Sequence, residues 1–443
     1  MDPTVTADYG RNWYAATMVE APARPPLAGD VDVEVCVIGG GLAGLTAARE
    51  IARRGWSVVL LEADRLAGKA SGRNTGFVLP GFAAQPESVI NRVGFAAAKD
   101  LWTLAQAGLD YVREVLVDDA MPGVEAEDGW LYVSKDDNGD AFTRFLGRLG
   151  EFGCEVEGWP TERVRAVLPS ERYFHAVHFP RALSIHPLNY ALGVAAAAER
   201  DGARIYEGTP VLSIDPNGVR KRVVTPQARL RAHHVVLAAN IGIGKLLPRL
   251  GGALLPVTTY VIVTVPLGAR LRQLIRYAGA VSDSDLADNH YRIVGGDRLM
   301  WSGRATAWRG NPRHYIAALT ADIARTFPQL GAVAADYAWS GTLGHTIHRM
   351  PQIGALGPGV WLASGFGGHG LNTTAIAGNL IAGAIVEGDE TWRRFSPFEI
   401  IWTGGILGRA TMQFYYWARR AREALAERQA RSREVTHRAA RNP

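Results

Sequence analysis

The feature that most constrains the fold is the stretch 32–64, DVEVCVIGGGLAGLTAAREIARRGWSVVLLEAD. It opens with an apolar, β-branched segment at 33–38, which is typical of a buried strand. Apolar residues then recur at helical spacing up to Gly55, where we expect the helix to end. A second apolar strand, from Ser57 to Leu61, completes a βαβ unit. This unit predicts an α/β fold with a Rossmann-like domain.

Three glycines, Gly39, Gly41 and Gly44, stand at G-x-G-x-x-G spacing between the first strand and the helix. In such a motif the first allows a tight turn, the second lets the backbone approach a pyrophosphate, and the third lets the helix pack closely on the strand. The helix N-terminus offers N–H groups and a positive dipole end to the phosphates. Glu62, at the end of the second strand, is placed to accept hydrogen bonds from an adenosine ribose and would repel a 2′-phosphate. We therefore predict a dinucleotide site that suits FAD or NAD better than NADP.

The next segment, GKASGRNTGF at 68–77, is rich in small residues. In a two-domain flavoprotein this segment returns across the far half of the cofactor, and its glycines would let main-chain N–H groups reach the ligand. Ser71 and Asn74 could bond the ligand or stabilise the turn. Arg73 would place a positive charge near the ring, where a reduced flavin carries negative charge. The alternative is an ordinary Gly/Ser surface turn.

The composition is that of a folded protein with roughly two to three domains. Gly accounts for 50 of 443 residues, with 47% apolar and 21% charged residues, which excludes a disordered or collagen-like chain. No window reaches 18 uninterrupted apolar residues, and the N-terminus lacks a basic region followed by an apolar run, so we expect a cytoplasmic protein without a transmembrane segment. Cys36 and Cys154 provide no disulfide framework, and Cys36 should be a small buried hydrophobe.

The net charge of +5 arises at the C-terminal end. The segment from Trp417 to Pro443 contains eight Arg and three Glu, which leaves residues 1–416 neutral. Because the basic footprint is one terminal helix and not a face of the fold, it favours a solvated tail over contact with nucleic acid or an anionic membrane. We expect no nucleic-acid partner.

Several segments along the chain resemble a known family. They are WYAA at 13–16, CVIGGGLAG at 36–44, ASGRNTG at 70–76, IHPLNYALG at 185–193, VVLAANIGIG at 235–244, NHYRI at 289–293 and ASGFGGHGLNTTAIAGNLIAG at 363–383. Together they resemble the FAD-dependent D-amino-acid-oxidase-type flavoproteins, in the branch of γ-glutamylputrescine oxidase. The likeness extends from about Arg11 to Phe398, and the Ser-Gly-Arg-Asn and Gly-Gly-His-Gly segments are its most specific parts.

The resemblance implies a Rossmann-like FAD-binding domain interleaved with an α+β substrate domain on a largely antiparallel sheet. The FAD-binding domain would take residues 1–100, 185–250 and 345–395, the substrate domain 101–184 and 251–344, and an aromatic, basic helical tail 396–443. Local patterns agree: 233–239 reads as a parallel strand, 258–267 as a half-buried strand, and 359–370 as a strand that enters a glycine-rich turn. The helix after that turn would direct its N-terminus at the flavin ring and stabilise negative charge there.

The resemblance also implies roles for individual residues. Cofactor contacts would come from Gly39, Gly41, Gly44, Glu62, Ala70, Ser71, Asn74, Thr75, Gly76, Val211, Gly365, Gly367, Gly368, His369 and Gly370. Arg73 and His369 would be catalytic, although a purely structural role for His369 is equally open. Tyr291, Trp301 and Asn372 would contact the substrate, and core packing is the alternative for the two aromatic residues and for Trp308.

The remaining histidines of interest have simpler interpretations. His186 precedes Pro187 at the start of a predicted helix, which favours a capping or packing role. His345 and His348 lie in GHTIHRMP, where no Asp, Glu or Cys completes a ligand set, so we expect no metal site.

Two absences bear on the substrate. Sarcosine oxidases carry Lys at the position of Asn372, and glycine and D-amino-acid oxidases carry Arg in the strand that corresponds to 340–344, here SGTLG. A carboxylate buried without a charged partner costs several kcal/mol. A small α-amino acid is therefore disfavoured, unless Arg292, Arg298 or Arg304 supplies a cation. Covalent-flavin members use a downstream Cys, and since no Cys follows Cys154 we expect non-covalent FAD.

These observations predict an FAD-dependent enzyme that oxidises a C–N bond of a small-molecule amine. Hydride would pass from the α-carbon to flavin N5, the imine would hydrolyse to an aldehyde, and O₂ would reoxidise the flavin to give H₂O₂. One alternative is an amino-acid or N-methyl-amino-acid oxidase or dehydrogenase. The other is a flavin-binding subunit of a larger complex, which the aromatic and basic C-terminal helix favours. The oligomeric state stays open.

Overall fold

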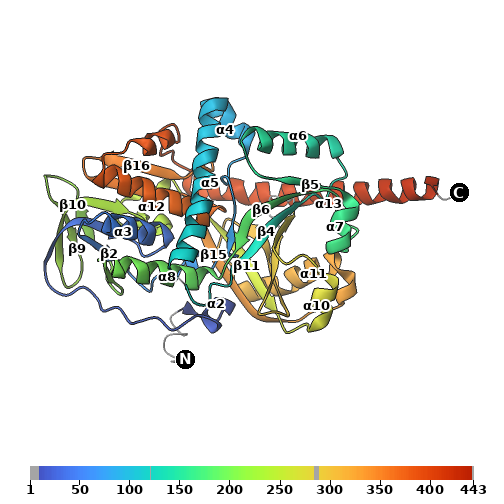
Figure 1. Cartoon of the computed structure of the whole chain (residues 1–443), viewed down its shortest axis with the longest axis horizontal. Helices are drawn as coiled ribbons and strands as arrows, with labels where there is room; N and C mark the ends of the chain where they lie inside the picture. Colours follow the sequence, from blue (N-terminus) through green and yellow to red (C-terminus); the bar gives the residue numbers. More distant parts are fainter. Residues whose placement is uncertain (1–8, 120, 284–288, 442–443) are drawn as a thin grey trace. The chain divides into compact units, whose positions relative to one another are not determined.

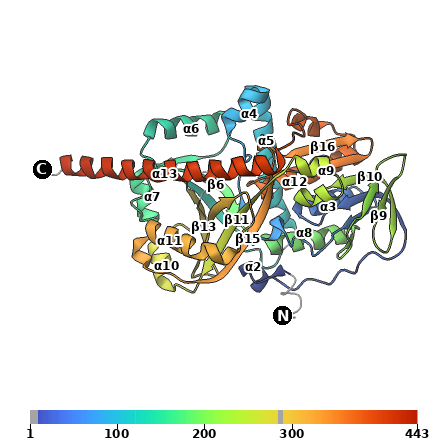
Figure 2. The same ribbon diagram turned by 180° about the vertical axis from the view of Figure 1, so that it is seen from behind.

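The computed structural model describes residues 9–119, 121–283 and 289–441 (Figures 1 and 2). The chain forms two compact units that alternate along the sequence. The first comprises Met1–Glu125, Ile185–Pro256 and Thr342–Gly405, and the second comprises Ala126–Ser184, Val257–Gly341 and Ile406–Pro443.

The first unit is built on a doubly wound sheet with the strand order β16-β17-β10-β1-β2-β7. Of the five pairings in this order, β16 with β17 is antiparallel, and β17 with β10, β10 with β1, β1 with β2 and β2 with β7 are parallel. The strands of this unit are β1 (Val31–Ile38), β2 (Val58–Leu61), β3 (Phe77–Val78), β7 (Arg204–Tyr206), β8 (Ser213–Asp215), β9 (Lys221–Val224), β10 (Arg229–Leu237), β16 (Gln352–Gly357) and β17 (Val360–Ser364). The strands predicted at 33–38, 57–61 and 233–239 are confirmed, and Cys36 is fully buried in β1.

The helices of this unit are α2 (Trp13–Ala16), α3 (Leu42–Arg53), α4 (Pro86–Val93), α5 (Phe95–Asp118), α8 (Pro187–Arg200), α9 (Pro248–Gly252) and α12 (Gly370–Val386), with 3-10 turns η1 (Ala70–Gly72), η2 (Asn240–Lys245) and η5 (Thr391–Phe395). Helices α3, α8 and α12 pack on the sheet. Helix α3 ends before Gly55, whose φ of +81° stops the helix as the sequence predicts. It packs beside both α8 and α12 (Figure 1).

Helix α5 lies in the first unit, whereas we had expected residues 101–184 to belong wholly to the second. The reason is a close helix–helix contact at Gly108, where a Cβ would lie 2.4 Å from the carbonyl oxygen of Asn372 on α12. Only a residue without a side chain allows two backbones this near to each other. The expected tail at 396–443 is likewise divided, since residues up to Gly405 belong to the first unit.

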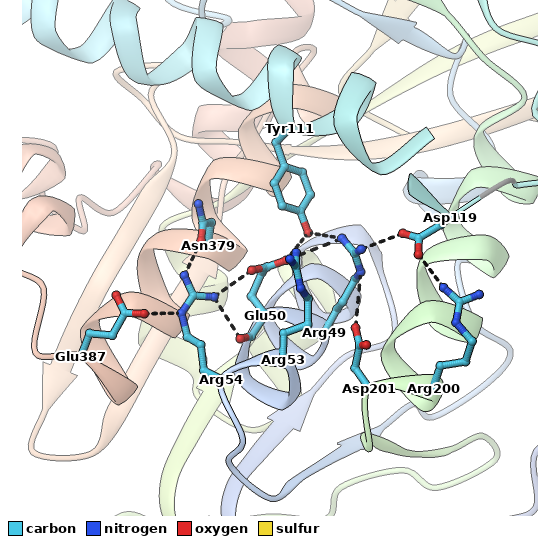
Figure 3. A network of polar contacts seen from close by, with 10 residues as sticks. All are labelled: Arg49, Glu50, Arg53, Arg54, Tyr111, Asp119, Arg200, Asp201, Asn379 and Glu387. Atoms are coloured by element: carbon cyan, nitrogen blue, oxygen red, sulfur yellow. Dashed lines mark hydrogen bonds and ion pairs between the residues drawn. The ribbon is translucent and has the colours of Figure 1, made fainter. Parts of the chain in front are cut away.

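A network of charges with a buried centre joins α3 to its neighbours (Figure 3). On α3, Arg49 pairs with Asp119 at 2.7 Å and Glu50 accepts a 2.7 Å hydrogen bond from the hydroxyl of Tyr111 on α5. The side chains of Arg49 and Glu50 are 4% and 6% exposed, so the pairing takes place away from bulk water. The network consists of Arg49, Glu50, Arg53, Arg54, Tyr111, Asp119, Arg200, Asp201, Asn379 and Glu387. It fixes the C-terminal half of the helix whose N-terminus follows the glycine motif.

The second unit is built on a mainly antiparallel sheet, ordered β15-β11-β14-β13-β12-β4-β6, with β5 paired to β6. Among the pairings with a described register, β12 and β4 run parallel and the others antiparallel. The strands are β4 (Glu127–Val133), β5 (Glu157–Trp159), β6 (Ala176–Ser184), β11 (Leu255–Thr264), β12 (Ala280–Asp283), β13 (His290–Val294), β14 (Arg298–Thr306) and β15 (Ala335–His345). The helices are α6 (Gly139–Glu151), α7 (Thr161–Val167), α10 (Ala269–Leu274), α11 (Ile316–Thr326) and α13 (Gly405–Arg441), with 3-10 turns η3 (Pro312–Tyr315) and η4 (Pro328–Leu330).

Candidate functional site

The glycine motif between β1 and α3 is shaped by close backbone contacts. Gly39 has φ +114°, and a Cβ there would lie 2.7 Å from the carbonyl oxygen of Ala238 after β10. A Cβ at Gly44 would lie 2.0 Å from the carbonyl oxygen of Gly39, which confirms that this glycine allows the helix to pack on the turn. Both positions therefore exclude a side chain for reasons internal to the fold.

Gly41 differs from its two partners. It is the N-cap of α3, with ordinary extended angles of φ −82° and ψ 175°. Among the described residues, a Cβ at this position would meet only the hydroxyl of Ser71, at 3.0 Å. A Cβ here requires only a small shift of the Ser71 hydroxyl, so the fold excludes a side chain much less strictly at Gly41 than at Gly39 or Gly44.

Glu62 follows β2 and faces the glycine turn. Its Oε2 accepts a 2.6 Å hydrogen bond from the backbone N–H of Gly40, and its Oε1 accepts one of 2.9 Å from the N–H of Asp64. Burial raises the pKa of this carboxyl above its usual value, against the opposing effect of the two backbone donors. The carboxylate thus lies at the carboxyl end of the sheet beside the glycine turn.

The loop 68–77 is held by its own hydrogen bonds and lies against the start of α3. The hydroxyl of Ser71 accepts from the N–H of Leu42 at 3.0 Å and so caps that helix. The amide of Asn74 donates to the carbonyls of Ala70 and Ser71 and accepts from the N–H of Gly76. Of the two roles considered for Asn74, this structure shows the stabilisation of the turn.

Arg73 contacts the N-terminal segment. Its Nη1 donates to the carbonyl of Tyr9 at 2.8 Å, and the hydroxyl of Tyr9 donates to the carbonyl of Leu66 at 3.0 Å. Burial, reinforced by the negative charge of Glu207, raises the pKa of Tyr9 to about 12. Sequence reasoning missed this contact because Tyr9 lies far from the loop in the chain and belongs to no recognisable motif.

The second glycine-rich segment connects β17 to α12. Gly365 and Gly367 have φ values of +72° and +58°, and a Cβ at Gly367 would lie 3.1 Å from the ring of His345. In contrast, a Cβ at Gly368 or at Gly370 would have nothing within 4 Å among the described residues. The turn is packed on the protein at its start and open where the helix begins.

His369 occupies the N-cap position of α12, the helix that follows this turn. Its backbone carbonyl accepts a hydrogen bond from the hydroxyl of Thr373, one turn into the helix. The predicted helix begins at Gly370, so its N-terminus borders the open end of the turn. Of the other predicted cofactor residues, Thr75 and Val211 are partly buried, and Val211 packs against the core of the sheet.

Asn372 differs from the expected substrate contact. Its side chain is fully buried, and its Nδ2 donates to the carbonyl oxygens of Gly81 at 3.0 Å and Ala105 at 3.3 Å. The amide therefore joins α12 to α5, and the donors of this residue are directed into the protein.

Tyr291 and Trp301, also expected at the substrate, lie in the core of the second unit. They are 1% and 0% exposed, and their rings stack with centroids 4.5 Å apart. The indole N–H of Trp301 donates to Asn289, and both rings pack edge-on to Phe327. This placement agrees with the core-packing alternative, because large aromatic faces gain most from burial against each other, and a contact with the substrate stays a prediction.

The three arginines that could have held a carboxylate have partners within the second unit. Arg304 makes a bidentate pair with Asp322, at 2.9 and 2.8 Å. Arg298 pairs with Asp336 at 2.5 Å and also donates to the carbonyl of Thr264. Arg292 is buried and donates to the hydroxyl of Ser184 at 3.4 Å. Arg298 is thus paired with one aspartate of its own, whereas Arg304 shares Asp322 with Arg325.

The histidines follow their simpler interpretations. The Nδ1 of His186 accepts from the N–H of Asn189 at 3.1 Å, so the predicted capping role is confirmed. Burial and the charge of Arg349 lower the pKa of His345 to about 4, so this ring is neutral at physiological pH. No three His, Cys, Asp or Glu side chains in the described ranges are grouped as metal ligands.

A comparison with protein families identifies the chain. The model described as "FAD dependent oxidoreductase" matches residues 34–384, which span both units. The chain belongs to the FAD-dependent oxidoreductase family. FAD is therefore its cofactor, and the chain is an oxidoreductase. In the part of the chain that the structure describes, no helix combines the length and apolarity needed to cross a membrane.

Two relatives cover most of the chain of this FAD-dependent oxidoreductase. The gamma-glutamylputrescine oxidoreductase of Escherichia coli is 30% identical over 407 residues, which are 88% of this chain and 92% of that protein. A protein of Haemophilus influenzae named "probable oxidoreductase OrdL" is 29% identical over 406 residues, 88% of this chain and 91% of its own. Among solved structures, glycine oxidase from Geobacillus kaustophilus superposes with a TM-score of 0.69 at 21% identity, covering 84% of this chain and 98% of that one. This structural likeness shows the shared fold.

Proposed function

We propose that this FAD-dependent oxidoreductase oxidises the C–N bond of an amine that has no carboxylate on the reacting carbon. The observation that carries the proposal is the pairing of Arg298 with Asp336 and of Arg304 with Asp322. A substrate carboxylate at either arginine would have to compete with an aspartate already bonded to it. The strand segment 340–344, SGTLG, contains no cation, and the Asn372 donors are directed at backbone carbonyls.

The residues near the glycine turns fit FAD. A side chain at position 41 would fill the space next to the Ser71 hydroxyl. Because Gly41 has none, a phosphate could approach the N-terminus of α3. Glu62 lies at the carboxyl end of β2, where an adenosine ribose would meet its carboxylate. The open end of the second turn, at Gly368 and Gly370, would face the other half of the cofactor. When bound, the flavin supplies a hydride acceptor at N5 and passes the electrons to O₂, with release of H₂O₂.

The protein side of the reaction then consists of positioning and electrostatics. Helix α12 directs its N-terminus out of the open turn and would stabilise negative charge on a neighbouring ring. Arg73, held by the carbonyl of Tyr9, would add a fixed positive charge from the loop 68–77. His345, neutral at physiological pH, would add no positive charge of its own beside the substrate amine. A neutral amine is the form that a desolvated site favours, and only this form can lose hydride from its α-carbon.

The relatives support the choice of an amine. The Escherichia coli relative is named for γ-glutamylputrescine, a compound with one primary amine at its putrescine end, far from the carboxylate of its glutamyl end. Binding such a substrate would require no cation beside the reacting carbon, in agreement with the paired arginines.

A screen of substrates tests the proposal. Purified enzyme would be incubated aerobically with a panel of primary amines, acylated diamines and amino acids, and H₂O₂ and aldehyde would be measured together. We expect equal amounts of both products from at least one amine. Turnover of amino acids alone would refute the choice of substrate, and aldehyde without H₂O₂ would show that O₂ is not the acceptor. If no compound reduces the flavin and gel filtration finds a single chain, the alternative of a flavin-binding subunit would replace an enzyme that acts alone.

A further inference from the structure

Helix α13 packs on the second unit through one stripe of residues. Arg409 donates to the carbonyl of Ala307, and Gln413 accepts from the N–H of the same residue at 3.0 Å. One turn further, Tyr416 is buried, and Arg420 donates to the carbonyl of Ala305 at 2.9 Å. The spacing of this stripe, at positions 409, 413, 416 and 420, is that of one helix face.

A second stripe of the same helix is apolar and exposed. It consists of Ile406, Leu407, Phe414, Trp417 and Leu425, which are between 57% and 77% exposed. Ala410 and Ala421, also exposed, continue it between the larger residues. Intervals of three and four residues place these side chains on one face, which adjoins the stripe that contacts the unit. Single exposed apolar residues are ordinary, but a continuous row with two large aromatic rings marks an interaction surface.

The net positive charge of this helix indicates that its partner carries negative charge. From Trp417 onward the chain carries eight Arg and three Glu, whereas residues 1–416 are neutral in sum. The partner must therefore accept apolar and aromatic side chains and also carry negative charge next to them. A second copy of the chain would bring another excess of five positive charges to the same surface, which opposes pairing at ordinary ionic strength.

We propose that α13 binds the surface of an anionic lipid bilayer. A helix that presents Trp, Phe and Leu on one face and carries a net positive charge in its sequence is suited to lie in the headgroup region, with the apolar side chains inserted at the acyl boundary. The arginines add attraction to acidic headgroups that decays within a Debye length. A helix bound in this way lies at the membrane surface and does not cross the bilayer.

The test measures binding of the full-length holoenzyme to sedimented vesicles. Vesicles of phosphatidylcholine alone are compared with vesicles that contain about one third phosphatidylglycerol, in 0.1 M and 0.5 M NaCl. We expect binding to the anionic vesicles at low salt, at least about tenfold weaker binding at high salt, and little binding to the neutral vesicles. A blue shift of tryptophan emission should accompany binding, because Trp417 leaves water.

Matched variants distinguish binding through α13 from non-specific binding of the protein to vesicles. The double variant Phe414→Ser and Trp417→Ser should lower vesicle affinity at least about tenfold, and Arg422→Gln should lower it about fivefold. Val219→Ser is the control: this residue is 80% exposed on the first unit and outside α13, so its loss should leave binding unchanged. Circular dichroism confirms that the variants fold.

Three results would overturn the proposal. Equal binding to neutral and anionic vesicles would show that charge does not contribute to binding. Undiminished binding of the Phe414/Trp417 variant would show that α13 is not the contact. The third result is a chain that does not bind vesicles but forms a dimer in light scattering. If the Phe414/Trp417 variant is a monomer in the same measurement, a second copy of the chain is the partner.

Discussion

The glycine motif allows a sharp prediction, because Gly41 and Gly44 face different constraints. Gly41 has extended backbone angles that alanine adopts without strain, and its nearest described neighbour is a side-chain hydroxyl at 3.0 Å. We therefore expect Gly41→Ala to destabilise the apoprotein by no more than about 1 kcal/mol, since Ala is a poorer N-cap than Gly and the Ser71 hydroxyl must shift slightly. In the holoenzyme the added methyl group would occupy the approach to the pyrophosphate, and overpacking of this kind costs about 1–3 kcal/mol. The Kd for FAD should rise about 5- to 150-fold.

Gly44→Ala is the matched comparison. Its Cβ would lie 2.0 Å from the carbonyl oxygen of Gly39, so the apoprotein itself should lose about 3 kcal/mol or more. The assay is urea unfolding of each apoprotein, followed by fluorescence titration of FAD. If Gly41→Ala destabilises the apoprotein as much as Gly44→Ala, or binds FAD with unchanged affinity, the assignment of Gly41 to the pyrophosphate is wrong. The larger Gly41→Val should abolish retention of FAD on gel filtration.

Three further predictions follow from the same contacts. Glu62→Gln should weaken FAD binding by about 1–2 kcal/mol in the same titration, since an amide replaces a charged acceptor; unchanged binding would exclude Glu62 as a ribose contact. Acid denaturation should release the flavin as free FAD, because no Cys follows Cys154, and flavin that stays with the precipitated chain would show a covalent bond through another residue. The pKa of Glu50 lies below its ordinary value near 4.5, because hydrogen bonds from Tyr111 and Arg54 and the charges of Arg53 and Arg49 outweigh the effect of burial, which raises it. A carboxyl group whose pKa is lower in the folded than in the unfolded state stabilises the fold at pH values above its unfolded pKa, and this stabilisation is lost as the pH falls. The free energy of unfolding should therefore fall from pH 5 to pH 3 in the wild type, and less steeply in Glu50→Gln. Parallel curves of the two proteins in urea unfolding would contradict this.

The sequence predicted the parts of the fold that local pattern determines. The βαβ unit, the end of α3 at Gly55 and the cap at His186 each depend on residues within a few positions of one another. The pairing of α5 with α12 was not predictable in this way. It depends on Gly108 meeting the backbone of Asn372, and no local pattern indicates which two helices approach so closely.

The candidate site shows the same division. The positions of Gly39 and Gly44 follow from the turn they make, and the structure gives each the close contact that the motif predicts. The positions of aromatic residues such as Tyr291 and Trp301 could not be predicted from the sequence, since the same side chains are suited to the wall of a pocket and to a core. Whether Arg298 and Arg304 are available to a ligand depends on aspartates brought near by the tertiary fold, 38 and 18 residues further along the chain.

The central claim, that the substrate amine lacks a carboxylate on the reacting carbon, is tested most directly by anaerobic flavin reduction with matched pairs of compounds. Each amino acid is paired with the amine formed by its decarboxylation, such as ornithine with putrescine, and the loss of oxidised-flavin absorbance is followed after mixing. We predict that the amine of each reactive pair bleaches the flavin faster than its parent amino acid, since Arg298 and Arg304 are already bonded to aspartates. Reduction by glycine, sarcosine or a D-amino acid at least about tenfold faster than by any amine, equivalent to 1.4 kcal/mol or more in the barrier, would contradict the claim.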